Sequence, residues 1–407
     1  MRARHRCRGG SAFVVLALGA CAAPAVHEER TAQLLASELD RLGRDPLELV
    51  IERLDAVDLV LFDDGLHSAV EPFELYAQLV RDPRFARRCD VLFLETIALD
   101  QQEHLDAFLD SPDGDPRLLL PALRNDVSGF GGIGYRALYE LLETVRRANR
   151  ERPPEEQLAV VAVSNATHWE TIRTRDDVQA FQASLADRDR EMYERILAEL
   201  DGFRSGMKGV FLTNTRHAYT GIRDARGELH WNTGTFFRQN HPGRTCSIRF
   251  HDVTLALEEE IAEPDAPHTA EGLERVRYRW ARVDGGRWDA AFAARGNRPV
   301  AIELAGTDFG RAPYLGNHML DAAPGQTMAD AYDALIFLAP LEALRQSATM
   351  PGLYGADFLP ELARRYALQR TDEELAAELA TAGVASVDEL VAGAFVEAPE
   401  RPVPAVE

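Results

Sequence analysis

Side chains able to do acid–base chemistry follow four apolar segments in the first half of the chain. In chain order, these polar ends are Asp64 with His67, then Glu95, then Asn165, and finally Asn214 with Arg216 and His217. In an open parallel sheet, ligands bind outside the carboxyl ends of the strands. If the four apolar segments are neighbouring parallel strands, these side chains meet at one edge. The spacing therefore predicts a single functional site there.

The residue types at this edge suit hydrolysis of an ester or an amide. His67 and His217 can each act as a general base, because the ordinary pKa of histidine lies near neutrality. In this hypothesis water activated by His67 attacks the carbonyl, while Asp64 and Glu95 orient the imidazoles. Arg188 is expected to hold the oxyanion or an anionic substrate group. The residues expected to bind substrate are Asn165, Asn214 and Arg216. No GxSxG sequence is present, so a covalent acyl-enzyme is not predicted.

Other interpretations of the same residues stay open. Two imidazoles and two carboxylates also suit a divalent metal ion, with Asp64, His67, Glu95 and His217 as ligands. Haem, held by His and Tyr side chains, is the other cofactor considered. In a purely structural interpretation, Asp64 caps the helix expected near Ala69. Glu95 ends an apolar segment and needs a partner, which Arg188 can supply without any catalytic role.

The elements that must position these residues alternate between strand and helix. Runs rich in Val, Leu and Phe without alternation predict strands covered on both faces. The runs are 58–64, 90–95, 158–165 and 208–214, with weaker ones at 245–252, 299–304 and 333–338. Helical spacing of apolar residues is found at 130–150 and 188–200. This order predicts an α/β fold with a mostly parallel sheet and helices on both faces.

The predicted domain organisation has one large α/β domain over residues 46–345. Within it, 222–330 is loosely patterned and is expected to supply the last strands and an insertion that covers a pocket like a lid. Residues 346–397 are expected to form a helical extension, where Thr371 with Glu374 and Ser386 with Glu389 have capping-box spacing. Residues 398–407 are rich in proline and are expected to be disordered.

The N-terminal sequence predicts export and lipid anchoring. Arginines precede a short apolar stretch, 11–20, that suits a cleaved signal peptide over residues 1–20. The sequence Leu18-Gly19-Ala20-Cys21 matches a lipobox, so Cys21 is expected to carry the lipid that holds the protein on a membrane. An ordinary signal peptide with an incidental cysteine is the alternative. Residues 21–45 are expected to form a tether and a first helix. No Asp follows Cys21, which favours the outer membrane in a cell with two membranes.

The net charge limits the classes of molecule that the protein can bind, and the cysteine count limits its disulfides. The 45 basic and 66 acidic residues give a formal charge of −21, which argues against nucleic-acid binding. The expected partners are a small-molecule substrate or haem, together with the membrane; the sequence does not determine the oligomeric state.

Two cysteines remain in the mature chain besides Cys21. Cys89 and Cys246 either pair as a disulfide or are two buried thiols.

Several short motifs resemble the superfamily that joins erythromycin-esterase-like enzymes with the ChaN/Tiki haem-uptake-related proteins. The matching segments, within about 55–340, are Asp63-Asp64-Gly65-Leu66-His67 (GExxH), Leu92–Glu95 (LALE), Asp100–Leu109, Arg188–Met192 (RDxxM), Phe211–Ala218 and Tyr332–Phe337 (YDALI). The resemblance implies a hydrolase-like enzyme, which the lipid expected at Cys21 would display on a membrane. A haem- or iron-binding uptake lipoprotein and a non-catalytic member are the alternatives. One departure is Asp63-Asp64 in place of the family's Gly-Glu, which shortens the first acid by one methylene.

Overall fold

The computed structural model describes residues 23–129, 134–260, 276–314, 322–396 and 398–403. The predicted signal peptide and Cys21 lie outside these residues. A seven-stranded sheet forms the centre of the molecule, in the order β3-β2-β4-β1-β5-β9-β8. Its strands are β1 (Leu59–Asp63), β2 (Val91–Ala98), β3 (Ala159–Ser164), β4 (Gly209–Thr213), β5 (Thr245–Phe250), β8 (Val300–Glu303) and β9 (Ala334–Phe337). All neighbours are parallel except β8 and β9. The predicted fold class is confirmed.

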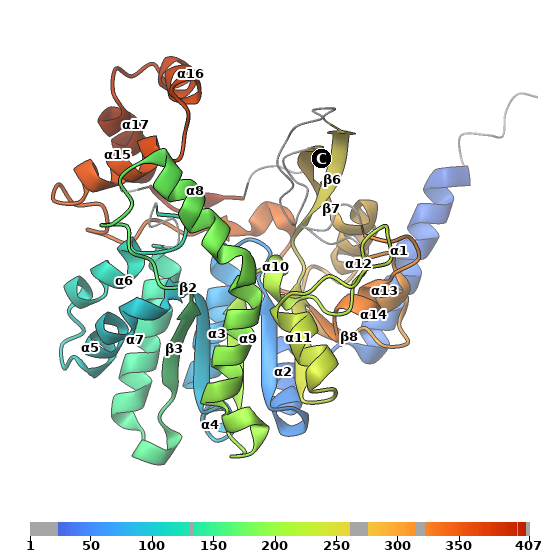
Figure 1. Ribbon diagram of the computed structural model, residues 1–407. Coiled ribbons are helices and arrows are strands. Elements are labelled where there is room, and N and C mark those ends of the chain that lie inside the picture. The colour runs from blue at the N-terminus through green and yellow to red at the C-terminus, as the bar shows by residue number, and fades with distance from the viewer. Residues whose placement is uncertain (1–22, 130–133, 261–275, 315–321, 397, 404–407) are drawn as a thin grey trace, which may run out of the picture.

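Helices cover both faces of the sheet (Figure 1), which explains why the strands are apolar at successive positions. Val60 and Phe62 of β1 belong to a core shared with α2 (Pro46–Ala56), α3 (Val70–Arg81) and α7 (Arg136–Glu151). Leu59 and Leu61 belong to a second core, packed against α9 (Arg188–Glu199) and α11 (Thr233–Asn240). The shorter helices in this half are α4 (Pro83–Ala86), α5 (Gln102–Asp110), α6 (Leu120–Arg124), α8 (Arg175–Ser184) and α10 (Thr215–Ala218).

The register of the sheet brings the carboxyl ends of four strands together. Strand β4 lies between β1 and β2, and β3 lies beyond β2. Asp63 is paired with Thr213, so Asp64 and Asn214 leave the sheet side by side. Leu94 pairs with Leu212, so Glu95 follows at the same level. The prediction that Glu95 ends its strand is wrong, because β2 continues to Ala98; Glu95 lies within β2, just after the last residue that pairs with β4. The polar residues of the four strands still share one edge.

The range 222–330 is divided between the sheet and elements outside it. It contributes β5, which lies between β1 and β9, and β8 at the edge. Strands β6 (Val253–Glu260) and β7 (Val276–Arg282) form a separate antiparallel hairpin. Helices α12 (Arg287–Ala294), α13 (Asp308–Arg311) and α14 (Met328–Ala331) follow, and α1 (Ala23–Leu42) packs against α12. Cys246 on β5 and Cys89 before β2 are both buried free thiols, so of the two alternatives the unpaired one holds.

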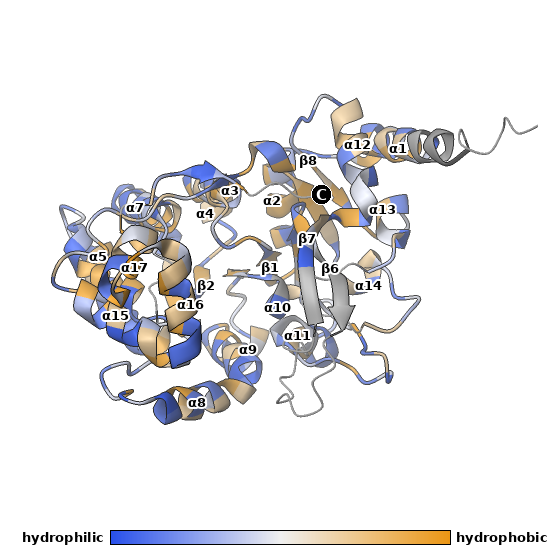
Figure 2. Cartoon of the chain, turned by 90° about the horizontal axis from the view of Figure 1, so that it is seen from above, coloured by the Kyte–Doolittle hydropathy of each residue, from blue (hydrophilic) through white to orange (hydrophobic). Residues whose placement is uncertain are grey.

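The C-terminal region is helical, with α15 (Leu359–Leu368), α16 (Asp372–Ala382) and α17 (Val387–Phe395). Seen from above, these helices lie on the α5 and α7 side, across β1 from the β6–β7 hairpin (Figure 2). Thr371 and Glu374 form the predicted capping box, and Ser386 accepts a hydrogen bond from the Glu389 N–H. In the described part of the chain, no helix has the length and apolar character needed to cross a membrane.

The prediction of a disordered tail is wrong for its first residues. Arg401–Pro402 (β11) pairs with Arg345–Gln346 (β10) in a small antiparallel ladder. Val403 is buried with Leu341 and Leu344, and its N–H donates to the Leu344 carbonyl. This apolar contact and the ladder hold a segment whose proline content alone favoured disorder.

Candidate active site

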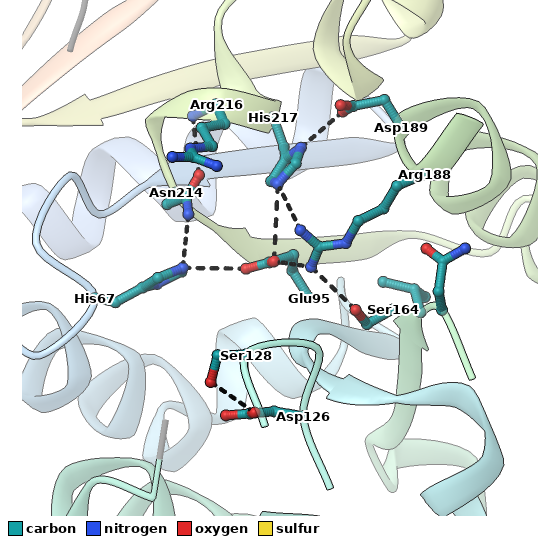
Figure 3. A network of polar contacts seen from close by, with 12 residues as sticks. His67, Glu95, Asp126, Ser128, Ser164, Arg188, Asp189, Asn214, Arg216 and His217 are labelled. Atoms are coloured by element: carbon teal, nitrogen blue, oxygen red, sulfur yellow. Dashed lines mark hydrogen bonds and ion pairs between the residues drawn. The ribbon is translucent and has the colours of Figure 1, made fainter. Parts of the chain in front are cut away.

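The first histidine of the site, His67, lies between two carboxylates at the end of β1. Its Nδ1 is 3.1 Å and 3.2 Å from the two carboxyl oxygens of Asp64. Its Nε2 is 3.1 Å from Oε2 of Glu95 and 2.8 Å from the amide nitrogen of Asn214 (Figure 3). Asp64 does not cap α3, because Ala69 is the N-cap residue and no side chain bonds there.

Two protonation states of His67 have different partners at Nε2. The neutral ring can accept from the Asn214 amide, while the protonated ring can donate to Glu95. Burial lowers the pKa of His67, but the charges and hydrogen bonds of Asp64 and Glu95 outweigh it and raise that pKa to about 10. At neutral pH the ring therefore carries a proton on both nitrogens.

Glu95 and Arg188 form an ion pair at the centre of the site. Nη2 of Arg188, the first residue of α9, donates to Glu95 Oε1 and, over 3.0 Å, to the Ser164 hydroxyl. The Glu95 side chain is 4% exposed. Burial raises the pKa of Glu95, but Arg188 and His67 overcome this and hold it well below its usual value. Nε of Arg188 is buried and has no hydrogen-bond partner among the described residues, so one donor of the guanidinium is left over.

The second histidine, His217, lies on α10 directly after β4. Its Nδ1 is 2.8 Å from Oδ1 of Asp189, and its Nε2 is 3.2 Å from Nη1 of Arg188. Because a guanidinium only donates, Nε2 accepts and the ring proton lies on Nδ1, facing Asp189. The backbone N–H and the hydroxyl of Thr233 also donate to Asp189. Burial raises the pKa of Asp189, but His217 and Thr233 bring it below its usual value.

The expected site residues lie around Glu95 with one exception. His217 Nε2 is 3.7 Å from Oε1 of Glu95, so the two imidazoles approach the same carboxylate from β1 and β4. Asn214 contacts His67, and its Oδ1 accepts the Arg216 N–H. Asn165 is the exception, since its amide donates to Glu191 on α9.

A cavity of about 380 Å³ opens beside this cluster. Arg188, Asp189, Arg216 and His217 form part of its wall, and Trp231 and Phe236 form another part. The rings of the two aromatic residues lie 5.0 Å apart, and Trp231 is 49% exposed. His67 and Glu95 do not line this cavity. His217 is therefore the imidazole that a molecule in the cavity meets.

The metal and haem alternatives gain no support from this geometry. In the part of the chain that the structure describes, no group of three or more His, Cys, Asp or Glu residues could hold a metal ion. The set Asp64, His67, Glu95 and His217 does not fit one because the Arg188 guanidinium already lies against both Glu95 and His217. Haem iron would have to displace Glu95 and Asn214 from Nε2 of His67, or Arg188 from Nε2 of His217.

Sequence reasoning missed two residues of the cluster. Asp189 stands beside Arg188 in the RDxxM motif, where adjacency to a candidate residue was the available signal. Ser164 ends β3 one position before Asn165, so the strand-end rule could have found it. His168, which lies three positions after Asn165, has a side chain that is 60% exposed and does not line the cavity.

The Asp63-Asp64 departure is accommodated by buried partners. Asp63 accepts from the Tyr332 hydroxyl at 2.5 Å and from the Gly65 N–H at 3.0 Å. Nη1 of Arg249 lies 3.6 Å from the same carboxylate, and Arg249 is fully buried. Gly65 has φ +43°, so the turn has its glycine one position after the two acids.

Comparison with known proteins finds relationships of fold and none of sequence. No protein-family model and no curated protein matches the chain. A Bacillus cereus protein of known structure matches with a TM-score of 0.50 and 12% identity, over 75% of this chain and 97% of that one. A succinoglycan biosynthesis protein matches with a TM-score of 0.50 and 8% identity, over 77% and 97%.

A mutant of the erythromycin esterase EreC, in its open conformation, matches with a TM-score of 0.46 and 12% identity, over 71% of this chain and 92% of that one. At such identities, likeness shows a shared fold alone. The chain therefore shares a remote relationship of fold with the first two proteins.

Proposed function

We propose that this protein is a hydrolase of esters or amides in which His217 is the general base. The observation that carries the proposal is the state of His217: Nδ1 is held by a buried carboxylate, and the ring lines a cavity with its Nε2 lone pair beside an arginine. An imidazole in this tautomer can take a proton from water.

The residues of the cavity support a direct attack by water. Water takes the place of the Arg188 N–H at Nε2 of His217. It forms a bond to the substrate carbonyl carbon and gives its proton to Nε2, while the carbonyl electron pair moves to oxygen. The positive charge of Arg188, which forms part of the cavity wall, is suited to stabilise this oxyanion. When the carbonyl re-forms, the ester C–O bond breaks and the leaving alkoxide takes the proton from Nε2. Asp189 stabilises the imidazolium formed between these steps.

In this proposal His67 is a positioning residue, although the sequence favoured it as the base. Its ring already carries two protons at neutral pH and lies between Asp64 and Glu95. It fixes Glu95, and Glu95 fixes Arg188.

The expected lipid anchor at Cys21 is part of the same proposal and would display the enzyme on a membrane surface.

The aromatic wall of the cavity favours substrates with a flat apolar group. Trp231 offers its ring to solvent and rests on Phe236. An aromatic pair contributes roughly 0.5–1.5 kcal/mol beyond buried area. A naphthyl ester should therefore bind about 2- to 12-fold more tightly than an alkyl ester, and Trp231→Ala should remove this difference.

The test is hydrolysis of a panel of activated esters, lactones and anilides by the purified protein. His217→Ala should lose about 10²–10⁴-fold in kcat. Its melting temperature must be measured alongside, because Asp189 loses a buried partner. His168→Ala is the matched control, because this exposed histidine does not line the cavity and its loss should change neither kcat nor the melting temperature. A wild-type chain without turnover on the whole panel, or a fully active His217→Ala variant, would sink the proposal.

A further inference from the structure

Three buried side-chain atoms next to the site form no hydrogen bond of good geometry with the described residues, although one of them, Oδ1 of Asp64, lies 3.1 Å from Nδ1 of His67. They are Oδ1 of Asp64, Nδ1 of His251 and Oδ2 of Asp252, on residues that are each at most 4% exposed. Asp64 follows β1, and the other two lie in the turn between β5 and β6. Buried polar atoms nearly always have a partner in folded proteins. Three exceptions in one place point to something they share.

All three residues line the same small cavity. Its volume is about 10 Å³, and the rest of its wall includes the apolar side chains of Phe250, Leu338 and Leu344. A volume of about 10–15 Å³ holds one water molecule when two to four polar atoms surround it.

The neighbours of each atom fix its hydrogen-bonding role. His251 Nε2 is 3.3 Å from Oδ1 of Asp289. Burial raises the pKa of Asp289, but the hydrogen bond from His251 brings it below its usual value, so Asp289 is a carboxylate and only accepts. Nε2 of His251 therefore donates, and its Nδ1 is left as an acceptor. Oδ1 of Asp64 is a second acceptor.

Asp252 supplies the donor. Burial raises the pKa of its carboxyl well above the usual value, against the pull of Arg249 and with the help of Asp63 and Asp64. Burial therefore favours the protonated form of this carboxyl, which can donate a hydrogen bond. The titratable and charged groups that face this region are Asp63, Asp64, His67, Glu95, Arg249, Arg282 and Asp289.

We propose that one buried water molecule joins Asp64, His251 and Asp252, and that Asp252 positions the Asp64–His67 pair through it. The water donates to Nδ1 of His251 and to Oδ1 of Asp64, and accepts from the carboxyl group of Asp252. Each of the three atoms gains a partner, and the water makes three hydrogen bonds, the usual number for a buried water. The turn after β5 thereby holds the carboxylate that orients His67.

The water site does not depend on the proposed function; its effect on catalysis does. The test is a high-resolution crystal structure of the wild-type protein, together with the NMR signal of the Nδ1 proton of His67 in wild type, Asp252→Asn and Asp252→Ala. The crystal should show one ordered water within hydrogen-bonding distance of all three atoms. Asp252→Asn keeps a donor and should leave the His67 signal in place, while Asp252→Ala should shift it.

Three results overturn the proposal. They are a crystal without this water, an His67 signal that is the same in Asp252→Ala as in wild type, and an Asp252→Asn variant that behaves like Asp252→Ala. None of these readouts needs turnover, so they separate the water site from the hydrolase. If the protein hydrolyses esters, Asp252→Ala should also lower kcat with little change in KM, and Asp252→Asn should restore it.

Discussion

Removing Arg188 should destabilise the protein by leaving Glu95 buried without its main partner. The Glu95 side chain is 4% exposed and that of Arg188 is 14% exposed, so neither charge is well solvated. Breaking such a pair from one side costs about 3–5 kcal/mol. Because Glu95 keeps His67 at 3.1 Å, we expect Arg188→Met to cost about 3 kcal/mol, near the lower limit. Urea unfolding followed by circular dichroism measures this free energy.

A double-mutant cycle isolates the pair from other losses. Glu95→Gln alone leaves Arg188 without its carboxylate, and the double variant Arg188→Met/Glu95→Gln has neither charge. The double variant should therefore lose about 1–3 kcal/mol less free energy of unfolding than the two single variants together. Arg204→Met is the control, since Arg204 pairs with Asp201 on the surface and should cost under about 1 kcal/mol. Additive costs within about 0.5 kcal/mol would refute the argument that Arg188 holds the buried charge.

The pair also predicts a pH dependence. The folded-state pKa of Glu95 is lowered, so its contribution to stability is present above the unfolded pKa, about 4.3, and is lost as pH falls through the folded value. In Arg188→Met the free energy of unfolding should therefore depend less on pH in this acidic range. An unchanged pH dependence would mean that other carboxylates dominate acid unfolding.

Three further predictions concern His67, Gly65 and the anchor. The folded pKa of His67, about 10, lies above its ordinary value of 6.5. Its contribution to the stability of the folded protein is therefore complete below pH 6.5 and is lost as pH rises through 10. Between these pH values the urea midpoint should fall less in His67→Gln than in wild type, and an equal fall in both proteins would contradict the raised pKa. Gly65→Ala should destabilise by roughly 1–3 kcal/mol, because its φ is +43° and its Cβ would overlap Asp252. Gly206→Ala is the control, because Gly206 also has a positive φ but no atom near the position of an added Cβ. An equal loss of stability in both variants would mean that the overlap with Asp252 does not matter. Cys21→Ser should move the protein from the membrane fraction to the soluble fraction, and wild-type protein without fatty acid on Cys21 would end the anchor prediction.

The strands of the sheet were predictable because a strand buried on both faces is apolar at successive positions in the sequence. Runs such as Leu59–Phe62 are apolar at every position, and polar residues follow where the chain leaves the sheet. Because parallel strands end at one edge of a sheet, the sequence alone predicts that Asp64, Glu95 and His217 lie together. This prediction needs no knowledge of the strand order, which runs β3-β2-β4-β1.

Partners supplied by distant segments could not be predicted in the same way. Thr233, which holds Asp189, and Arg249, which holds Asp63, come from parts of the chain with no motif of their own. The assignment of the base was also beyond the sequence. His67 and His217 follow strands in the same manner, and only their surroundings differ: two carboxylates around one, a cavity beside the other.

The most direct test of the central claim is chemical rescue of His217→Ala by imidazole. Loss of the ring leaves space beside the 380 Å³ cavity, where added imidazole can reach Asp189 and the attacking water. We predict that imidazole restores ester hydrolysis in His217→Ala with saturation, and that it restores nothing in His67→Ala, whose ring lies outside the cavity wall. Rescue of His67→Ala and not of His217→Ala would contradict the assignment of His217 as the general base.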